Sequence, residues 1–449
     1  MSPVADAQKF KAGPKSRAMF AEEQEYLAPG LQSIALFSEL ALDSGKGSTI
    51  RDVDGNEYLD FVAGIGVASL GYSHPDYVRV MQEQIGKITV GSFTTAHRLS
   101  FTKALARHTP KGLARIQLYS SGAEAVEAAL RLAKSRTKKY EVISFWGGFH
   151  GKTGGVLGLL GDSFKHGLGP LMPGLHLSPY PNPYRCPLKA EGTHDCAAHC
   201  LEFLREMIRR QTAGSIAAII AEPIQGTAGN VIPPAGFWKG LRELSRELDA
   251  LLISDEMITG FGRTGAMFGC EHEGIVPDVM TVGKGMAGGF PVSGVITTSE
   301  IAASKPFANP SGSSSSYGGN PLAAAACDAA FGVLLKEKLV QNSKTVGAKL
   351  LERLRRLAEA HPWLGNVRGR GLMIGVDLVA DKKTRKPLDS AICREIFDEA
   401  LGRGLLTMAY TASLRINPPL CVTQAEAMRG ADILEEALTA VLKRHGKRG

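Results

Sequence analysis

The chain of 449 residues has few of the features that mark membrane, secreted or nucleic-acid-binding proteins. No stretch reaches the ~18–20 consecutive apolar residues that a membrane-spanning helix needs. Residues 1–20 contain no apolar segment of the kind found in secretory signal peptides. Dense runs of lysine and arginine are also missing, and the net charge of +8 is mild for this length. That charge fits a basic cleft for an anionic ligand at least as well as a nucleic-acid surface, so we expect neither a membrane nor a nucleic acid as partner.

Cysteine is scarce as well. The seven cysteines are an odd number scattered along a long chain, so we expect no disulfide framework and a reducing, cytoplasmic location. Hydrophobic residues make up 44% of the chain and charged residues 21%, which is ordinary for a globular protein and excludes intrinsic disorder and collagen-like architectures. At ~150 residues per domain, the length predicts two to three domains.

Glycine, by contrast, is abundant, with 52 residues. Many stand in short clusters beside apolar runs, where the backbone must turn sharply or approach a ligand closely. The runs themselves are short and apolar on both faces, which is typical of strands in a buried, mostly parallel sheet. The expected strands are Ile116–Tyr119, Glu141–Phe145, Ile216–Ala221, Ala250–Ser254, Val279–Val282 and Val292–Thr297.

Amphipathic stretches separate several of these strands. Apolar residues recur at helical spacing in Gly122–Lys134, and further helices are expected at Cys200–Arg210 and Phe237–Leu248. The alternation of strands and helices predicts the α/β class, with helices on both sides of a doubly wound sheet.

The two ends of the chain differ from this middle part. Residues 330–360 are rich in Lys, Arg and Leu and are expected to be helical, and Val367–Leu378 is expected to form one glycine-punctuated strand. Gly47–Leu59 predicts a hairpin whose turn is Asp54-Gly55. We therefore expect a large central domain, residues 76–330, and a smaller α+β domain built from residues 1–75 and 331–449.

The segment Ser120–Glu124 is a candidate phosphate site. It follows a β-like stretch and opens a helix, so free backbone N–H groups, the helix dipole and serine hydroxyls meet at one place, which suits a phosphate. A serine that only caps the helix would give the same pattern.

Two further candidates follow strands. Asp255 ends an apolar strand, where α/β proteins bind ligands and where a buried carboxylate can hold a pyridinium proton. Lys284 lies between two glycines after another strand, and an amine kept from water there would be nucleophilic towards a carbonyl. Taken singly, a solvated loop acid and a surface lysine remain the alternatives.

An aromatic residue completes the set. Phe149, in Phe149-His150-Gly151, follows a strand and a glycine turn and is able to stack on a flat heterocycle, although core packing is the simpler alternative. Phosphate cradle, aromatic plate, acid at a strand end and amine between glycines are the parts needed to hold pyridoxal phosphate. The joint pattern is much more specific than any one of its parts.

These residues lie in segments that resemble the class III pyridoxal-phosphate-dependent aminotransferases of the 4-aminobutyrate/ω-amino-acid type. The matching segments follow the family's order from about residue 50 to residue 420. They are FVAGIGVASLGYSHP, SSGAEAVEAALRLAK, WGGFHGKT, AEPIQG, ISDEMITGFGRTG, PDVMTVGKGMAGGFP, SSYGGNPLAAAA, VRGRGLMIG and LRINPPL.

The resemblance implies fold type I and a homodimer with active sites at the subunit interface, and leaves open whether two dimers pair into a tetramer. It implies Lys284 as the lysine that bonds to the cofactor, Asp255 as partner of the ring nitrogen and Phe149 as the stacking ring. Substrate contacts are implied for Arg415, which would pair with a carboxylate, and for Lys152 and Ile65. The remaining cofactor-binding residues that it implies are Ser121, Gly122, Ala123, His150, Glu222, Met257 and Ser316.

Three positions depart from the family's pattern. Ile258 stands where a glutamine often contacts the cofactor, and Thr227 stands where many 4-aminobutyrate and ornithine enzymes have a glutamate. Lys152 replaces an arginine that often binds a distal carboxylate, so the charge is kept but the planar fork is lost. The expected activity is therefore transfer of an amino group from a 4-aminobutyrate-like ω-amino acid or amine to a 2-oxo acid, by a ping-pong mechanism, with the donor open.

Other functions fit the same fold. Amino-acid racemases and dialkylglycine decarboxylases share the family's parts, and a catalytically silent ligand-binding protein is an alternative from another class. The segment Pro179–Cys200 holds five potential zinc ligands, but their spacing matches no common zinc motif and we expect no metal. These ligands are Cys186, His194, Cys196, His199 and Cys200.

Overall fold

The computed structural model describes residues 12–188 and 195–446, which divide into two compact units. One consists of the chain up to His74 together with the chain from Asn342 onwards, and the other of Pro75–Gln341. No helix within the described ranges is long and apolar enough to cross a membrane.

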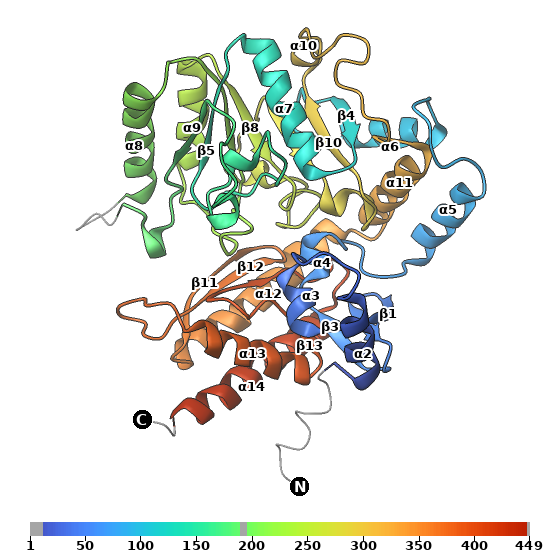
Figure 1. The fold of residues 1–449 in the computed structure, drawn as a ribbon, viewed down its shortest axis with the longest axis vertical. Coiled ribbons are helices and arrows are strands. Elements are labelled where there is room, and N and C mark those ends of the chain that lie inside the picture. The colour runs from blue at the N-terminus through green and yellow to red at the C-terminus, as the bar shows by residue number, and fades with distance from the viewer. Residues whose placement is uncertain (1–11, 189–194, 447–449) are drawn as a thin grey trace. The chain divides into compact units, whose positions relative to one another are not determined.

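The unit formed by Pro75–Gln341 contains a sheet of seven strands (Figure 1). Only β10 runs against its neighbours, β4 and β9, so the other six strands are parallel to one another and the predicted mostly parallel sheet is confirmed. In spatial order the strands are β4 (Arg115–Tyr119), β10 (Ser293–Thr297), β9 (Val279–Val282), β8 (Leu251–Asp255), β7 (Ile216–Ala221), β5 (Glu141–Phe145) and β6 (Leu175–Ser178).

Helices cover both faces of this sheet because its strands are apolar on both sides. In β7, Ile219 packs with residues of α8 and α9, whereas the next residue, Ile220, packs with residues of α7. Successive strand residues point to opposite faces, so one short apolar run contributes to two cores. The helices of the unit are α5 (Pro75–Ile85), α6 (Ala96–Ala106), α7 (Gly122–Thr137), α8 (Cys196–Gln211), α9 (Phe237–Glu247), α10 (Ser299–Ala302) and α11 (Pro321–Lys336). Short 3₁₀ turns are η1 (Leu157–Leu159), η2 (Ser163–Lys165), η3 (Pro183–Arg185), η4 (Gly269–Glu273) and η5 (Lys284–Ala287).

The other unit has two small antiparallel-rich sheets. The first has the order β1 (Leu42–Lys46), β2 (Thr49–Asp52), β3 (Glu57–Asp60) and β13 (Leu405–Leu406), and the second β11 (Leu364–Arg370), β12 (Met373–Leu378) and β14 (Ser413–Ile416). Its helices are α2 (Pro14–Glu23), α3 (Ser33–Ser38), α4 (Ala63–Gly66), most of α12 (Leu339–Ala360), α13 (Ser390–Gly402) and α14 (Gln424–Gly446).

Two sequence expectations meet different outcomes here. The hairpin is confirmed as β2 and β3, with Gly55 at φ +89 in its turn. The single strand expected over Val367–Leu378 is wrong, because the chain reverses at Gly371, with φ +55, and β11 pairs antiparallel with β12. A residue in the left-handed conformation is compatible with a tight turn between two strands and incompatible with one continuous strand.

Candidate active site

Most of the predicted site residues lie at one edge of the seven-stranded sheet. Ser121 follows β4, Phe149 follows β5 and Glu222 follows β7, while Asp255 is the last residue of β8 and Lys284 comes two residues after β9. These five strands are parallel, so their carboxyl ends share one edge. Open α/β sheets bind ligands at that edge.

The start of α7, predicted to bind a phosphate, is a capped helix with free amides in its first turn. Ser121 is the N-cap, and its Oγ accepts a hydrogen bond from the amide of Glu124 at 3.2 Å. The amides of Gly122 and Ala123 come before that bond and belong to the first turn, which has no intrahelical partners. The Ser293 hydroxyl donates to the Ser121 carbonyl at 2.6 Å and so holds the turn against β10.

Asp255 and His150 form a buried pair. The Nδ1 atom of His150 lies 2.6 Å from Oδ2 of Asp255, and each side chain is only 1% exposed. Oδ1 of Asp255 accepts the amide of Met257 at 3.1 Å. Burial lowers the pKa of His150, but the hydrogen bond and charge of Asp255 outweigh burial and leave that pKa above its ordinary value. The pair therefore favours a protonated imidazole against a carboxylate.

Glu222 connects this pair to the aromatic segment. Its two carboxylate oxygens accept the amides of Phe149 and Gly226, both at 3.0 Å. Burial raises the pKa of Glu222, and the nearby His150 acts in the opposite direction. From the far side, the Tyr180 hydroxyl donates to the Glu222 carbonyl at 2.9 Å.

Lys284 is held in an unusual backbone conformation. Its φ is +43, in the left-handed region that costs an L-residue ~1–2 kcal/mol. The residue before it, Gly283, has no room for a side chain, because an added Cβ would lie 2.7 Å from Sδ of Met257. A Cβ on Gly122 would lie 3.2 Å from the same sulfur. Met257 thus fills the space between the start of α7 and the backbone that presents Lys284.

The aromatic candidate contacts a second ring and a cation. Phe149 and Phe164 meet edge to face with ring centroids 5.7 Å apart. The Lys152 ammonium lies 4.6 Å from the Phe164 centroid and 5.8 Å from that of Phe149. Such cation–π contacts orient an exposed lysine without neutralising it.

Three predicted residues are not part of this cluster. Ser316 lies in an exposed loop before α11. Ile65 and Arg415 belong to the other unit. Arg415 is on β14, next to the Tyr410 hydroxyl; burial raises the pKa of Tyr410, and the guanidinium opposes that effect.

Ile65 lies in a strained turn. The four residues of α4, Ala63–Gly66, all have positive φ, and Ile65 is at φ +66. The Asp60 carboxylate accepts the amides of Val62 at 2.7 Å and Ala63 at 3.0 Å and so fixes the start of the turn. A β-branched residue in this region is an outlier of the kind that clusters at functional sites.

Sequence reasoning missed several residues that shape the site. Glu256 is 0% exposed and accepts the amides of Gly269 at 2.7 Å and Cys270 at 2.8 Å, so it anchors the loop that follows Asp255. Burial raises the pKa of Glu256. The one available signal is that Glu256 directly follows Asp255, the last residue of an apolar strand.

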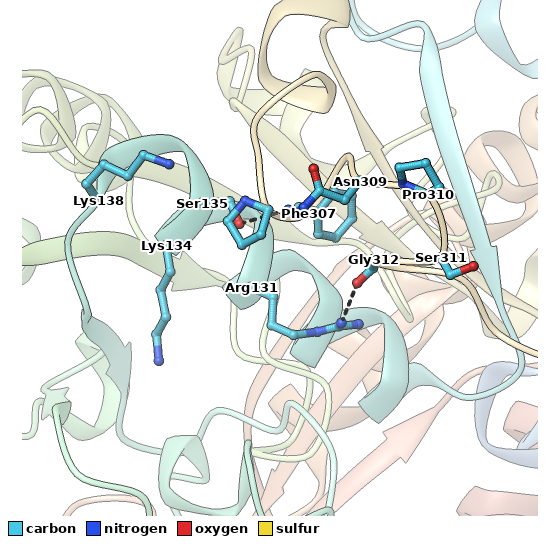
Figure 2. A pocket seen from close by; sticks show the side chains of 10 residues that line it. Arg131, Lys134, Ser135, Lys138, Phe307, Asn309, Pro310, Ser311 and Gly312 are labelled. Carbon is cyan, nitrogen blue, oxygen red and sulfur yellow. Dashed lines mark hydrogen bonds between the residues drawn. The ribbon is translucent and has the colours of Figure 1, made fainter.

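Other features lie outside this edge. A pocket of about 580 Å³ lies beside the second half of α7. Arg131 donates to the Gly312 carbonyl at 3.2 Å there, and the Phe307 amide donates to the Ser135 hydroxyl at 3.3 Å (Figure 2). These bonds fasten residues 306–312 to the helix, and none of the predicted site residues lines the pocket. Within the described residues no group of histidine, cysteine and acidic side chains is arranged to hold a metal, and His194 lies outside them.

Comparison with known proteins gives consistent matches along the chain. The family profile described as aminotransferase class-III matches residues 34–438. A diaminobutyrate–2-oxoglutarate aminotransferase of Rhizobium meliloti is 34% identical, over 96% of this chain and 94% of its own. An alanine/serine racemase of Pyrococcus horikoshii is also 34% identical, over 96% of this chain and 92% of its own. A solved amine transaminase from an uncultivated Pseudomonas species, bound to pyridoxal phosphate, superposes with a TM-score of 0.84 at 32% identity, covering 94% of this chain and 98% of that one.

Proposed function

The chain belongs to the class III aminotransferases, which depend on pyridoxal phosphate, and from this premise we propose that it transfers an amino group from an ω-amino acid or amine to a 2-oxo acid by a ping-pong mechanism. The observation that carries the proposal is the placement of Asp255 and Lys284 at the carboxyl ends of adjacent parallel strands, β8 and β9. An acid for a ring nitrogen and an amine for a carbonyl are thereby brought to one edge of the sheet.

The residues at that edge fit the cofactor chemically. The first turn of α7, with Ser121, Gly122 and Ala123, offers amides and a hydroxyl to the phosphate. Gly122 keeps this cradle open, because a side chain there would meet Met257 at 3.2 Å. Asp255, supported by His150, is the partner for the ring nitrogen, and Phe149, held by Glu222, is the stacking ring.

Asp255, His150 and Lys284 have different tasks in the proposed reaction. Bound pyridoxal phosphate supplies an electron sink for the substrate carbon that carries the amino group. Asp255 would hold the proton on the ring nitrogen, and His150 keeps the Asp255 side chain oriented through their 2.6 Å contact. The Lys284 Nζ takes a proton from the substrate carbon as general base and later returns one as general acid.

The substrate class rests on four positions. We assign Arg415 to the carboxylate of the 2-oxo acid, because a guanidinium binds carboxylates bidentately. Lys152 would attract a second, distal carboxylate as a point charge. Ile65, together with Thr227 in place of a glutamate, favours a donor that is apolar beyond its amino group over a strict 4-aminobutyrate enzyme.

We further propose a homodimer with active sites at the subunit interface. Ser316 and Tyr317 support it: both are exposed, Tyr317 to 65%, so this loop is accessible to a second subunit. The Ser316 hydroxyl would then reach the cofactor phosphate of the neighbouring subunit.

Half-reactions test this function. The purified holoprotein is mixed, without acceptor, with 4-aminobutyrate, β-alanine, ornithine, simple amines and α-amino acids, and the visible band of the bound cofactor is followed. A true donor abolishes the band, and a 2-oxo acid restores it. Lys284→Ala should lose turnover entirely; appreciable transamination by that variant, or no donor that bleaches the wild-type band, would refute the proposal.

The racemase relative supports a second candidate function, epimerisation of an α-amino acid. Both activities need the same lysine and ring acid, so the site does not separate them. A chiral assay without any keto acid does: inversion of an amino acid with no amine transfer would favour racemisation.

A further inference from the structure

Three of the seven cysteines converge outside the residues assigned to the active site. Cys196 and Cys200 are one turn apart at the start of α8 and therefore share a helix face. Cys186, directly after η3, comes against that face, with its Sγ 3.6 Å from Sγ of Cys196.

The three thiols differ in their exposure to solvent. Cys196 and Cys200 are 4% and 1% exposed, whereas Cys186 is only partly buried. Burial raises the pKa of Cys196 to about 11, and Cys186 beside it acts in the same direction. The buried thiol is thus a poor first nucleophile, and the partly exposed one is the point of entry for a reagent.

Contact between two thiols is the geometry from which a disulfide closes. The S–S bond is ~2.05 Å long, so two sulfurs that already lie 3.6 Å apart need to approach by only about 1.5 Å. We propose that Cys186 and Cys196 are an oxidative modification site, at which a peroxide converts the two thiols reversibly into a disulfide.

The reaction balances with hydrogen peroxide as the oxidant. The Cys186 thiol gives up its proton, its sulfur attacks one peroxide oxygen and the O–O bond breaks, so that Cys186 becomes a sulfenic acid and the leaving hydroxide takes up that proton as the first water. The Cys196 sulfur then attacks the Cys186 sulfur, the S–O bond breaks, and the leaving hydroxide takes the Cys196 proton to give a second water. Two thiols are oxidised by two electrons, and one peroxide is reduced to two waters.

The disulfide would act on a segment that touches the active site. Residues 178–186 join β6 to η3 and carry Tyr180, whose hydroxyl donates to the Glu222 carbonyl. One end of this segment is thereby held by Glu222, and the cross-link would fasten its other end to α8. This consequence for the site rests on the proposed function, whereas the cross-link itself does not.

Peptide mapping of the full-length holoprotein tests the proposal. The reduced protein is treated with a small excess of hydrogen peroxide, free thiols are blocked with N-ethylmaleimide, and non-reduced digests are analysed by mass spectrometry. The expected product is a Cys186–Cys196 cross-linked peptide, with two of the seven thiols lost and both recovered with dithiothreitol.

Variants make the assignment specific. Cys186→Ser and Cys196→Ser should each abolish the cross-link, whereas Cys421→Ser should keep it. Cys421 is a matched control, because it is also partly buried but its Sγ lies 3.9 Å from the Ser48 hydroxyl. If Cys196→Ser fails to fold, Cys186→Ser, which changes the more exposed thiol, carries the test.

Several results would overturn the proposal. A cross-link from Cys186 to Cys200, or a Cys186 that proceeds to sulfinic acid with Cys196 still free, would exclude this pair. Equimolar zinc in the purified protein, with thiols that react only after chelation, would show a metal site instead. None of these outcomes bears on transamination, so failure here and failure of the proposed function are distinguishable.

Discussion

The imidazole of His150 and the carboxylate of Asp255 meet at 2.6 Å with both side chains 1% exposed, from segments 105 residues apart in the chain. A charge pair so fully removed from water is costly to break from one side, because the remaining charge has no compensation. The pair should therefore contribute to the pH dependence of stability, and it includes the carboxylate that we propose as partner of the cofactor ring.

The first prediction concerns that pH dependence in the cofactor-free protein. The folded-state pKa of His150 is raised, so its stabilisation is fully present below the ordinary histidine pKa of about 6.5 and is lost as pH rises through the folded-state value. The difference in unfolding free energy between wild type and His150→Asn should shrink with rising pH, by at most ~1.4 kcal/mol per pH unit. Urea unfolding of both proteins between about pH 6 and 9 measures it.

Asp255→Asn supplies the control. Without the carboxylate, burial is the largest influence left on His150 and lowers its pKa, so the histidine then destabilises the fold as pH falls. Glu222 and Lys284 also act on this histidine, in opposite directions, and both remain in each variant. A stability difference that does not change with pH would contradict a protonated His150.

The second prediction concerns the packing around Met257. Gly283→Ala places a Cβ 2.7 Å from Sδ of Met257, although φ 177 at this glycine is open to any residue. Overpacking of this kind costs ~1–3 kcal/mol and should weaken retention of the cofactor. Adding Met257→Ala removes the sulfur, so the double variant should be less destabilised than the sum of the single variants.

Thermal denaturation and the fraction of bound cofactor after gel filtration measure this coupling. Gly154→Ala is the matched control, because no atom lies within 4 Å of the added Cβ. Strict additivity of the two changes would show that Met257 does not link the start of α7 to the backbone of Lys284.

The strands around these residues were predictable because each must be apolar on both faces. β5, β7 and β9 have the bounds that the sequence predicts, and β8 and β10 differ by one residue at their ends. The hairpin of β11 and β12 was missed because its turn, Gly371-Leu372, has one glycine and none of the Asn, Asp or Pro residues that usually mark a turn.

The placement of several predicted site residues at one edge of the sheet was also predictable, because each ends or follows a parallel strand. The residues that hydrogen-bond to the loops around them were not predictable. Glu256 is satisfied by amides 13 and 14 residues away, and Tyr180 reaches a carbonyl 42 residues away. Such contacts join backbone groups across the fold and leave no periodic signal. Sequence patterns therefore point to residues that follow the parallel strands, while the residues that hold them become visible only in three dimensions.

The third prediction concerns the left-handed turn at Ile65. The conformation at φ +66 costs an L-residue ~1–2 kcal/mol, and glycine avoids most of that cost. Ile65→Gly and Ile65→Ala both remove the side chain, but only glycine relieves the backbone. The glycine variant should be more stable than the alanine variant by ~1 kcal/mol.

Thermal unfolding of the two variants measures the strain, and their half-reaction rates measure the side chain. If Ile65 contacts the substrate, both variants should lose donor affinity to the same extent. A glycine variant no more stable than the alanine variant would mean that the turn is not strained.

The fourth prediction separates the two halves of the reaction through Arg415. Replacing it by leucine removes the guanidinium proposed to bind the 2-oxo acid carboxylate. Transition-state stabilisation for the acceptor should fall by ~2 kcal/mol or more, so the second-order rate constant of the acceptor half-reaction should fall about 30-fold. An amine donor that carries no carboxylate makes no such contact, so the donor half-reaction should stay within about threefold of wild type. Stopped-flow measurement of each half-reaction alone gives both numbers.

The neighbourhood of Arg415 refines this test. The Tyr410 hydroxyl lies beside the guanidinium, so Tyr410→Phe should weaken the acceptor half-reaction in the same direction but less, by loss of orientation and not of charge. Arg429→Leu changes an exposed arginine of α14 in the same unit and should leave both halves unchanged. Equal losses in the two half-reactions of Arg415→Leu would assign this residue to the fold or the cofactor, since only a contact made by the acceptor alone can slow one half and spare the other.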